Sequence, residues 1–341
     1  MTVPDPHRIV LTILIPVAAA LICAGLIVVL RPLLQRYALA RPNARSSHIT
    51  PTPQGGGIAV MAATAIAAAL TGLLGAPSPN DAIPIVMAAA FLLAAVGMID
   101  DLRPIPVVPR LVSQLAAVAL LFAFLPGQIR ILEAIPIALE RALLVLALLW
   151  FINLVNFMDG LDWMTVAEML PMTAALAAFA FFGEAPSDVL PTALALAGAL
   201  LGFAPFNRPV ARLFLGDVGS LPIGLLTGWC LLELASRQHI AAALLLPLYY
   251  LADATITLFR RVANRERFWD AHRSHFYQRA TDNGLSVGQV VTSVFVLNLL
   301  LAGLATASIA MRSTAVDLTV LVLGALGVMV VLVLFSRSRT D

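Results

Sequence analysis

The sequence predicts an all-α protein that crosses a lipid membrane many times. Of its 341 residues, 60% are hydrophobic and only 12% are charged, and the mean hydropathy is +0.94. A chain with so few polar side chains cannot cover the surface of a water-soluble globule. Because backbone polar groups must be paired inside lipid, long apolar runs there are expected to form helices.

Eleven apolar runs approach the roughly 17–25 residues that a membrane-spanning helix needs. They lie at 9–30, 56–74, 83–99, 109–125, 136–156, 163–182, 188–205, 220–235, 239–258, 286–311 and 316–335. The first run lacks a clear small-residue cleavage site, so we expect a membrane span and not a removable signal peptide. We therefore expect residues 1–341 to form one membrane domain of about eleven helices.

The arginines predict the orientation of these helices. The chain has no lysine, and basic residues in short loops favour the cytoplasmic side. With the amino terminus outside, 16 of the 21 arginines fall inside and 5 outside, and the opposite orientation would invert that ratio. The carboxyl terminus is then expected inside. The net charge of +2 gives no reason to expect a nucleic-acid partner.

Three acidic sites fall on the inner side, each at the edge of an apolar run. Asp100 and Asp101 follow the third run, residues 153–162 combine two amides with two carboxylates, and Asp217 precedes the eighth run. Charged groups at the membrane edge are kept where they meet water, a cation or a ligand. The inner loop expected at 259–285 adds many arginines and two histidines, a concentration suited to an anionic ligand or to lipid headgroups.

Each of these features also has a simpler structural interpretation. Asp100 and Asp101 could form a solvated helix end, Asp217 could belong to a helix start with Ser220 as its N-cap, and the arginines could serve only topology. In combination, however, carboxylates, cations and free N–H groups at Gly219 and Ser220 indicate phosphoryl transfer with Mg²⁺. The histidine spacing is a poor zinc signal.

The motifs together resemble the polyprenyl-phosphate N-acetylhexosamine-1-phosphate transferases of glycosyltransferase family 4. That family includes phospho-MurNAc-pentapeptide translocase and the enzymes that start O-antigen, common-antigen and teichoic-acid synthesis. The resemblance covers nearly the whole chain. It depends on Arg45–His48 with Pro51–Gly57, Gly97–Asp101, Asn153–Asp162, Asn207–Ser220, and Pro247–Asp253 leading to His272–His275.

The resemblance implies transfer of an N-acetylhexosamine 1-phosphate from its UDP derivative to undecaprenyl phosphate, with release of UMP. The donor would carry GlcNAc or a 6-deoxy-HexNAc, and the product would start O-antigen (lipopolysaccharide) or another envelope polysaccharide. The family also implies Mg²⁺, with Mn²⁺ as a substitute, an active site on the cytoplasmic face of the bacterial inner membrane, and membrane lipid around the protein. It is compatible with a homodimer.

The same resemblance assigns roles around the phosphates. Asp217 corresponds to the principal Mg²⁺ ligand, and Asn156 to an amide that approaches the same ion. Asp100 and Asp101 correspond to the pair nearest the lipid phosphate, and either could act as a base. Asp159 would lie beside the sugar phosphate.

Other positions correspond to donor-binding residues. Asp162 and Asn207 would meet the uracil edge, and Phe214 would stack on uracil. Arg45 and Ser220 are further candidates for substrate binding, and His272, Arg273 and His275 would hold the diphosphate as catalytic residues.

The sequence departs from the family pattern in this last segment. Where relatives have adjacent histidines, this chain has His272-Arg273-Ser274-His275, in which Arg273 could substitute as a bidentate donor. The variant is closer to the O-antigen-initiating branch than to the peptidoglycan branch. The role of Asp253 does not follow from the sequence, and it could simply pair with an arginine.

Three alternative functions follow from a many-spanning chain with these carboxylates. An ion-coupled transporter would have an inverted repeat and midplane carboxylates, whereas the acidic sites here lie at one face. A CDP-alcohol phosphotransferase would need a second Gly-x-x-x-Asp-x-x-x-Asp element after residues 159–162, and none follows. Phospho-MurNAc-pentapeptide transfer is the alternative within the resembled family.

Overall fold

The computed structural model describes residues 6–40, 51–74, 82–125, 129–132, 134–266 and 273–338. These residues form a helical bundle and one small antiparallel sheet, in which β1 (Leu39–Ala40) pairs with β2 (Thr52–Pro53). The helices are α1 (Pro6–Tyr37), α2 (Gly56–Leu74), α3 (Ile83–Leu102), α4 (Val107–Phe124), α5 (Ile137–Met158), α6 (Met164–Phe181), α7 (Val189–Phe203), α8 (Asp217–Ser236), α9 (Ile240–Leu245), α10 (Leu248–Ala263), α11 (Phe276–Asp282), α12 (Val287–Met311) and α13 (Thr314–Ser336).

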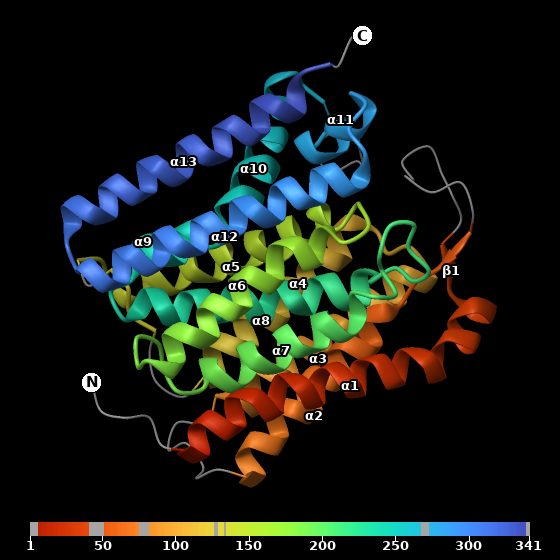
Figure 1. The fold of residues 1–341 in the computed structure, drawn as a ribbon, viewed down its shortest axis with the longest axis horizontal. Coiled ribbons are helices and arrows are strands. Elements are labelled where there is room, and N and C mark those ends of the chain that lie inside the picture. The colour runs from red at the N-terminus through yellow and green to blue at the C-terminus, as the bar shows by residue number, and fades with distance from the viewer. Residues whose placement is uncertain are drawn as a thin grey trace.

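The predicted all-α membrane fold is confirmed. Among the described helices, eight are long and apolar enough to cross a membrane, and α2 and α7 are shorter apolar helices. Large apolar side chains are exposed along α1, α4 and α13, where lipid can solvate them. The protein is therefore a multi-pass membrane protein. α1 begins and α13 ends at opposite ends of the bundle (Figure 1). The number eleven stays a prediction.

The prediction of a single helix at 239–258 is wrong. The chain instead forms the short α9, breaks at Pro247, and continues as α10 to Ala263. Proline has no N–H group, so it removes one hydrogen bond from the ladder of a helix. The long loop expected at 259–285 is also partly helical, because the end of α10 and all of α11 lie within it.

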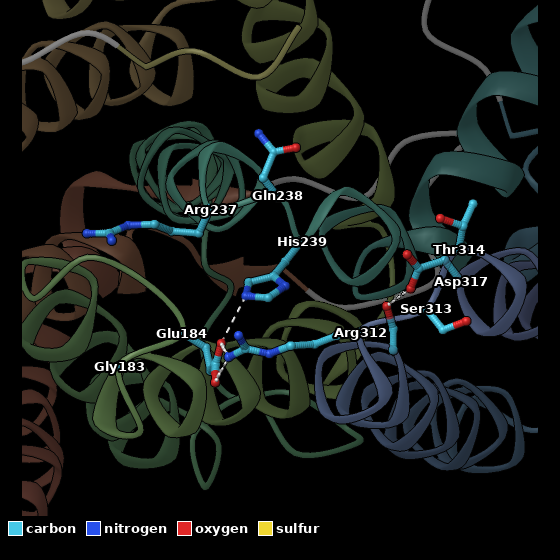
Figure 2. A pocket seen from close by; sticks show the side chains of 10 residues that line it. Gly183, Glu184, Arg237, Gln238, His239, Arg312, Ser313, Thr314 and Asp317 are labelled. Atoms are coloured by element: carbon cyan, nitrogen blue, oxygen red, sulfur yellow. Dashed lines mark hydrogen bonds and ion pairs between the residues drawn. The ribbon is translucent and has the colours of Figure 1, made fainter. Parts of the chain in front are cut away.

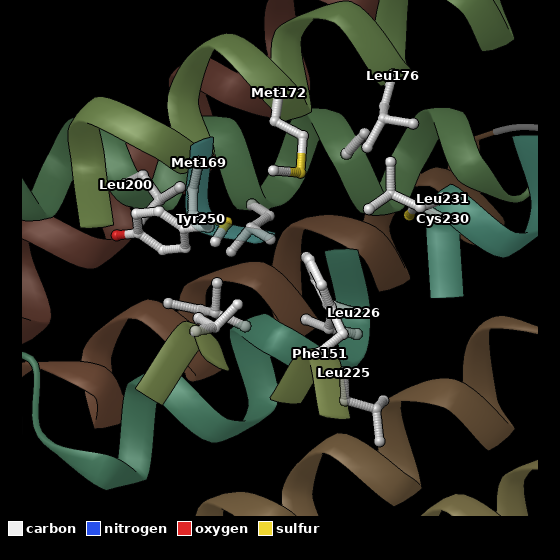
Figure 3. Close-up of a cluster of buried hydrophobic side chains, with 14 of the residues drawn as sticks. Phe151, Met169, Met172, Leu176, Leu200, Leu225, Leu226, Cys230, Leu231 and Tyr250 are labelled. Carbon is white, nitrogen blue, oxygen red and sulfur yellow. The ribbon is translucent and has the colours of Figure 1, made fainter. Parts of the chain in front are cut away.

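α8 is the central helix of the bundle. Buried residues make up 89% of its apolar stretch, against 22% for α1 and for α4. It packs between α3 and α5, while α1, α2 and α7 form one side of the molecule and α12 and α13 pair on the other (Figure 1). Side chains from α5, α6, α7, α8 and α10, among them Phe151, Met172 and Leu226, meet in the apolar core (Figure 3).

α3 and α8 approach each other backbone to backbone. A Cβ atom on Gly97 would collide with the carbonyl group of Asp217. Small residues allow such close helix crossings in membranes. The contact brings the carboxyl end of α3, which carries two aspartates, against the amino end of α8.

Candidate active site

Four of the predicted site residues lie together at one end of the bundle. Asp100 and Asp101 belong to the last turn of α3, Asn156 to the last turn of α5, and Asp217 is the first residue of α8. Because α3 and α5 end where α8 begins, residues far apart in the sequence meet at this point.

The Asp101 carboxylate holds the amino terminus of α8. Its Oδ1 accepts the N–H of Asp217 at 3.0 Å, and its Oδ2 accepts the N–H of Val218 at 3.1 Å. The N-cap residue, Gly216, has a φ angle of 78°, and a Cβ atom there would collide with this carboxylate. Negative charge at a helix amino terminus also interacts favourably with the helix dipole.

Two expectations about this helix start are wrong. α8 begins at Asp217 with Gly216 as N-cap, so Ser220 lies inside the helix and does not cap it. The N–H groups of Gly219 and Ser220 both donate to the Gly216 carbonyl at 3.0 Å. Since the two preceding N–H groups bind Asp101, the N–H groups of this first turn are not free to bind an anion.

Arg110, in the first turn of α4, connects two carboxylates. Its Nη1 lies 3.0 Å from Oδ2 of Asp100 and 3.8 Å from Oδ2 of Asp217. Asp100 also accepts the N–H of Ile105 at 2.5 Å, which orders the turn between α3 and α4. The guanidinium therefore supplies positive charge where the two carboxylates converge.

Asn156 connects α5 to α8 across the same site. Its Nδ2 donates to Oδ1 of Asp217 at 2.8 Å and to Oγ of Ser220 at 2.9 Å. Asn153 lies one turn earlier and has a different role, since it donates to Oε1 of Gln114 at 2.7 Å and joins α5 to α4. Only the second amide of the 153–162 motif thus reaches Asp217.

Asp159 follows the last turn of α5. Burial raises the pKa of its carboxyl to about 7, and the charges of Asp101 and Asp162 act in the same direction. Thr165 opposes them by donating its hydroxyl hydrogen to Oδ1 at 2.5 Å. The group therefore titrates near neutral pH in the folded protein.

Asp162 and Asn207 join two loops next to the site. Oδ2 of Asp162 accepts the N–H of Ala211 at 2.9 Å. Oδ1 of Asn207 accepts the N–H of Trp163 at 2.7 Å, and its Nδ2 donates to the Leu213 carbonyl at 3.0 Å. Both side chains are buried. They connect the α5–α6 turn to the α7–α8 segment, and their expected contact with uracil stays a prediction.

Phe214 is half-buried in the α7–α8 segment. Its backbone pairs with the end of β2 and the residues that follow it. Its N–H donates to the Pro53 carbonyl at 2.8 Å, and its carbonyl accepts the N–H of Gly56 at 2.9 Å. Gln54, directly after β2, donates its Nε2 hydrogen to the Asp101 carbonyl at 2.7 Å. The turn-rich segment at 51–57 is therefore attached to the end of α3.

The histidine and arginine of the variant motif are bound within the protein. The His275 side chain is 3% exposed, and its Nδ1 lies 3.2 Å from Oδ1 of Asp253. Nη2 of Arg273 lies 3.0 Å from Oδ1 of Asp282. The expectation that Asp253 pairs with an arginine is therefore wrong, because its basic partner is His275. Two further candidates, Arg45 and His272, lie outside the described residues.

Comparison with known proteins finds a family match over the central part of the chain. Residues 83–235 match the family model described as Glycosyl transferase family 4. The chain is 32% identical over 239 residues to decaprenyl-phosphate N-acetylglucosaminephosphotransferase of Mycobacterium leprae, covering 62% of this chain and 58% of that protein. It is 29% identical over 307 residues to phospho-N-acetylmuramoyl-pentapeptide-transferase of Mycolicibacterium smegmatis, covering 75% and 83%.

The central part of the chain, from α3 to α8, thus matches glycosyl transferase family 4. A second N-acetylglucosaminephosphotransferase, from Mycolicibacterium smegmatis, is 34% identical over 212 residues, covering 56% of this chain and 52% of that protein. The chain thus spans just over half the length of these decaprenyl-phosphate relatives. The region that matches the family 4 model runs from α3 to α8. It therefore contains Asp100, Asp101, Asp159, Asp162 and Asp217, but neither α10, which carries Asp253, nor α11.

The residues around Asp217 fit the metal that family 4 implies. Within the described part of the chain, no group of three or more His, Cys, Asp or Glu side chains is placed to hold a metal ion. Mg²⁺, however, usually takes only one or two protein ligands and completes its shell with water and substrate phosphate. Asp217, Asp100 and the amide oxygen of Asn156 are hard ligands of this kind at one position.

Several site residues do not follow from the sequence motifs. In the sequence, Arg110 is only one of the sixteen arginines expected on the inner side, but in the structure it binds Asp100. Thr165 lies outside the motifs that resemble the family, but it binds Asp159. Gln54 lies within the quoted 51–57 motif, which is the one signal that could have identified it. Tyr277 follows the variant motif directly, and its hydroxyl reaches α5.

A polar cavity of about 390 Å³ lies at the other end of α8 (Figure 2). There the Glu184 carboxylate binds Nε2 of His239 at 3.1 Å and Nη2 of Arg312 at 2.9 Å. A helix of 20 residues is about 30 Å long. This cavity is therefore separate from the candidate active site, and none of the predicted site residues lines it.

Proposed function

We propose that the protein transfers an N-acetylhexosamine 1-phosphate from a UDP-sugar to undecaprenyl phosphate and releases UMP. The supporting observation is the convergence of Asp100, Asp217, Asn156 and Arg110 at one end of the bundle, within the region that matches family 4. Phosphoryl transfer needs positioning and charge neutralisation more than covalent help from the protein. Two relatives are named as N-acetylglucosaminephosphotransferases that use decaprenyl phosphate.

In the proposed reaction, an oxygen of the lipid phosphate attacks the phosphorus that carries the sugar. The bond from this phosphorus to the bridging oxygen breaks, and UMP leaves with the electron pair. A phosphate monoester has a second pKa of about 6, so the nucleophile is largely ionised at neutral pH. A protein base is therefore not required, which agrees with the engagement of Asp101 by the α8 N–H groups.

The polar residues then have separate tasks. Asp217, with Asn156 and Asp100, would hold Mg²⁺, which when bound neutralises charge on the departing phosphate. Arg110 carries a second positive charge beside the same carboxylates. Asp159, with its raised pKa, is placed by this proposal beside the sugar phosphate.

We place the site on the cytoplasmic side of the bacterial inner membrane, with the amino terminus outside. The division of the arginines, 16 to 5, supports this orientation. Mn²⁺ is expected to substitute for Mg²⁺. A role in starting O-antigen synthesis and a homodimeric assembly belong to the same proposal.

Release of UMP by purified protein in detergent tests the reaction. With UDP-GlcNAc, undecaprenyl phosphate and Mg²⁺, we expect UMP and a lipid diphosphate sugar, and we expect chelation to stop turnover. Asp217→Asn should remove most of the activity, whereas the matched variant Asp317→Asn, at the other end of the bundle, should retain it. A transporter would release no UMP. High activity in well-folded Asp217→Asn would exclude Asp217 from the reaction.

A donor panel tests the choice of sugar. We expect turnover with UDP-GlcNAc or a UDP-linked 6-deoxy-HexNAc and none with UDP-MurNAc-pentapeptide. His272→Ala and Arg273→Ala should depress turnover or raise the KM for the donor, with little effect on the KM for lipid phosphate. Use of the pentapeptide donor would instead support the alternative within the family.

A further inference from the structure

We propose that Asp253 is a positioning residue, which holds α11 against the end of α5 and thereby sets the geometry of the Asn156–Asp159 segment. Asp253 and Tyr277, which carry this proposal, lie in α10 and α11, outside the region that matches the family model. The effect on catalysis rests on the function proposed above, but the structural link does not.

Asp253 is fully buried and accepts hydrogen bonds from three directions. From α11, the N–H of Phe276 binds Oδ1 at 3.0 Å and the N–H of Tyr277 binds Oδ2 at 3.1 Å. Within α10, the hydroxyls of Tyr249 and Thr257 lie 3.1 Å and 3.3 Å from the carboxylate. Nδ1 of His275 completes the shell at 3.2 Å.

An ionised carboxylate suits this environment better than any neutral side chain. A buried charge is tolerated only when it is paired and hydrogen-bonded. Here four N–H or O–H donors and one imidazole point at two oxygens that only accept. An amide at this position would replace one accepting oxygen by a donor and leave at least one buried N–H or O–H group without an acceptor.

The link from α11 to the active site is made by Tyr277. This side chain is fully buried, and its hydroxyl donates to the Phe157 carbonyl at 3.0 Å. Carbonyls in the last turn of a helix lack intrahelical partners, so Tyr277 satisfies one of them at the end of α5. Phe157 directly follows Asn156, which contacts Asp217.

Gly160 makes this contact sterically feasible. A Cβ atom on Gly160 would collide with the Tyr277 hydroxyl. The turn after α5 is therefore shaped to receive this side chain. A chain of direct contacts leads from Asp253 through Tyr277 and Phe157 to the residues beside Asp217.

Hydrogen–deuterium exchange tests the structural link without any need for activity. In Asp253→Asn we expect exchange to rise at least tenfold in peptides covering 275–283 and 157–163, and to stay unchanged in α12. In Tyr277→Phe, exchange should rise in 157–163. Faster exchange in 275–283 alone would show that the position of α11 is not transmitted to α5, and unchanged exchange in both variants would overturn the proposal.

Kinetics test the consequence for catalysis. Tyr277→Phe should lower kcat five- to tenfold with both KM values within twofold, because the ring stays in place and the geometry of α5 changes. The control Tyr249→Phe removes a hydroxyl that is bound to Asp253 and not to the end of α5, so its kcat should stay within twofold. Equal losses in the two variants would contradict the proposal. If the wild type releases no UMP, the proposed function fails while the exchange experiment still decides this inference.

Discussion

At the scale of single residues, three carboxylates near the site are bound to the backbone of another segment. Asp101 accepts two N–H groups of α8, Asp162 accepts one from the α7–α8 segment, and Asp253 accepts two from α11. These three side chains hold segments in place. Asp100 and Asp217, joined by Arg110, are left as the charges that face each other.

Replacing Asp101 should therefore reduce stability as well as activity. In Asp101→Asn the amide places a donor against one of the α8 N–H groups, which should cost about 1–3 kcal/mol. We expect a lower Tm in detergent. Asp100→Asn serves as the comparison, because its carboxylate binds Arg110 and the N–H of Ile105 but no N–H group of α8. A wild-type Tm in an inactive Asp101→Asn would place this residue on the substrate instead.

Asp159 gives a prediction for pH. Its pKa is raised from 3.8 to about 7 in the folded protein, so the folded state binds this proton more tightly than the unfolded state. Stability is then lost as pH rises between these two values. With chelator present, Asp159→Asn should show a flatter decline of Tm between pH 5 and pH 8 than the wild type. Asp282→Asn, at an exposed carboxylate, is the control, and parallel curves for Asp159→Asn and wild type would contradict the assignment.

At the scale of elements, the site depends on how closely α3 approaches α8. Gly97 lies at their crossing, directly before the turn that carries Asp100 and Asp101. Any side chain there would push the end of α3 away from the first N–H groups of α8. The spacing of two helices thus controls the position of two carboxylates.

Gly97→Ala should therefore destabilise the protein by about 1–3 kcal/mol, the usual cost of overpacking. Gly303→Ala in α12 is the matched control, because a Cβ atom at Gly303 meets nothing within 4 Å. Thermal unfolding in detergent should separate the two variants. If Gly97→Ala unfolds at the wild-type temperature, the crossing tolerates a side chain and the close contact is not essential.

The helices could be predicted largely from apolar run length, because lipid leaves the backbone few alternatives. The break between α9 and α10 could not be predicted in this way. Pro247 is one of several prolines within apolar runs, and α1, α6 and α8 contain proline without breaking. What differs at 239–263 is the polar face of α10, whose Asp253 has partners in the distant α11.

The candidate site was predictable at the level of which residues gather, but not of what each one binds. Asp100, Asp101, Asn156 and Asp217 stand at helix ends, where the sequence places them on one face. Whether a carboxylate there faces a ligand or a backbone N–H depends on the distance between helices. In the case of Asp101, the distance between α3 and α8 is set by Gly216 and Gly97. The presence of these two glycines in the sequence does not reveal that the helices come so close.

At the scale of the whole molecule, the distribution of arginine predicts which end of the bundle faces the cytoplasm. Reporter fusions after Arg36, Arg103 and Arg212 should all report the cytoplasm, and fusions at Ser187 and Gln238 the outer side. Eleven spans would also place the two chain termini on opposite sides of the membrane. A carboxyl terminus found outside would refute this orientation.

The central burial of α8 also has a consequence for sequence variation. A helix surrounded by protein on nearly all sides accepts few replacements, because each side chain fills a fixed space, whereas a helix facing lipid accepts most apolar exchanges of similar size. In a saturation-mutagenesis library selected for folded, inserted protein, we expect α8 to show the lowest tolerance and α1, α4 and α13 the highest. Tolerance along α8 should be low at every position, without the three-to-four-residue period that a half-exposed helix would show.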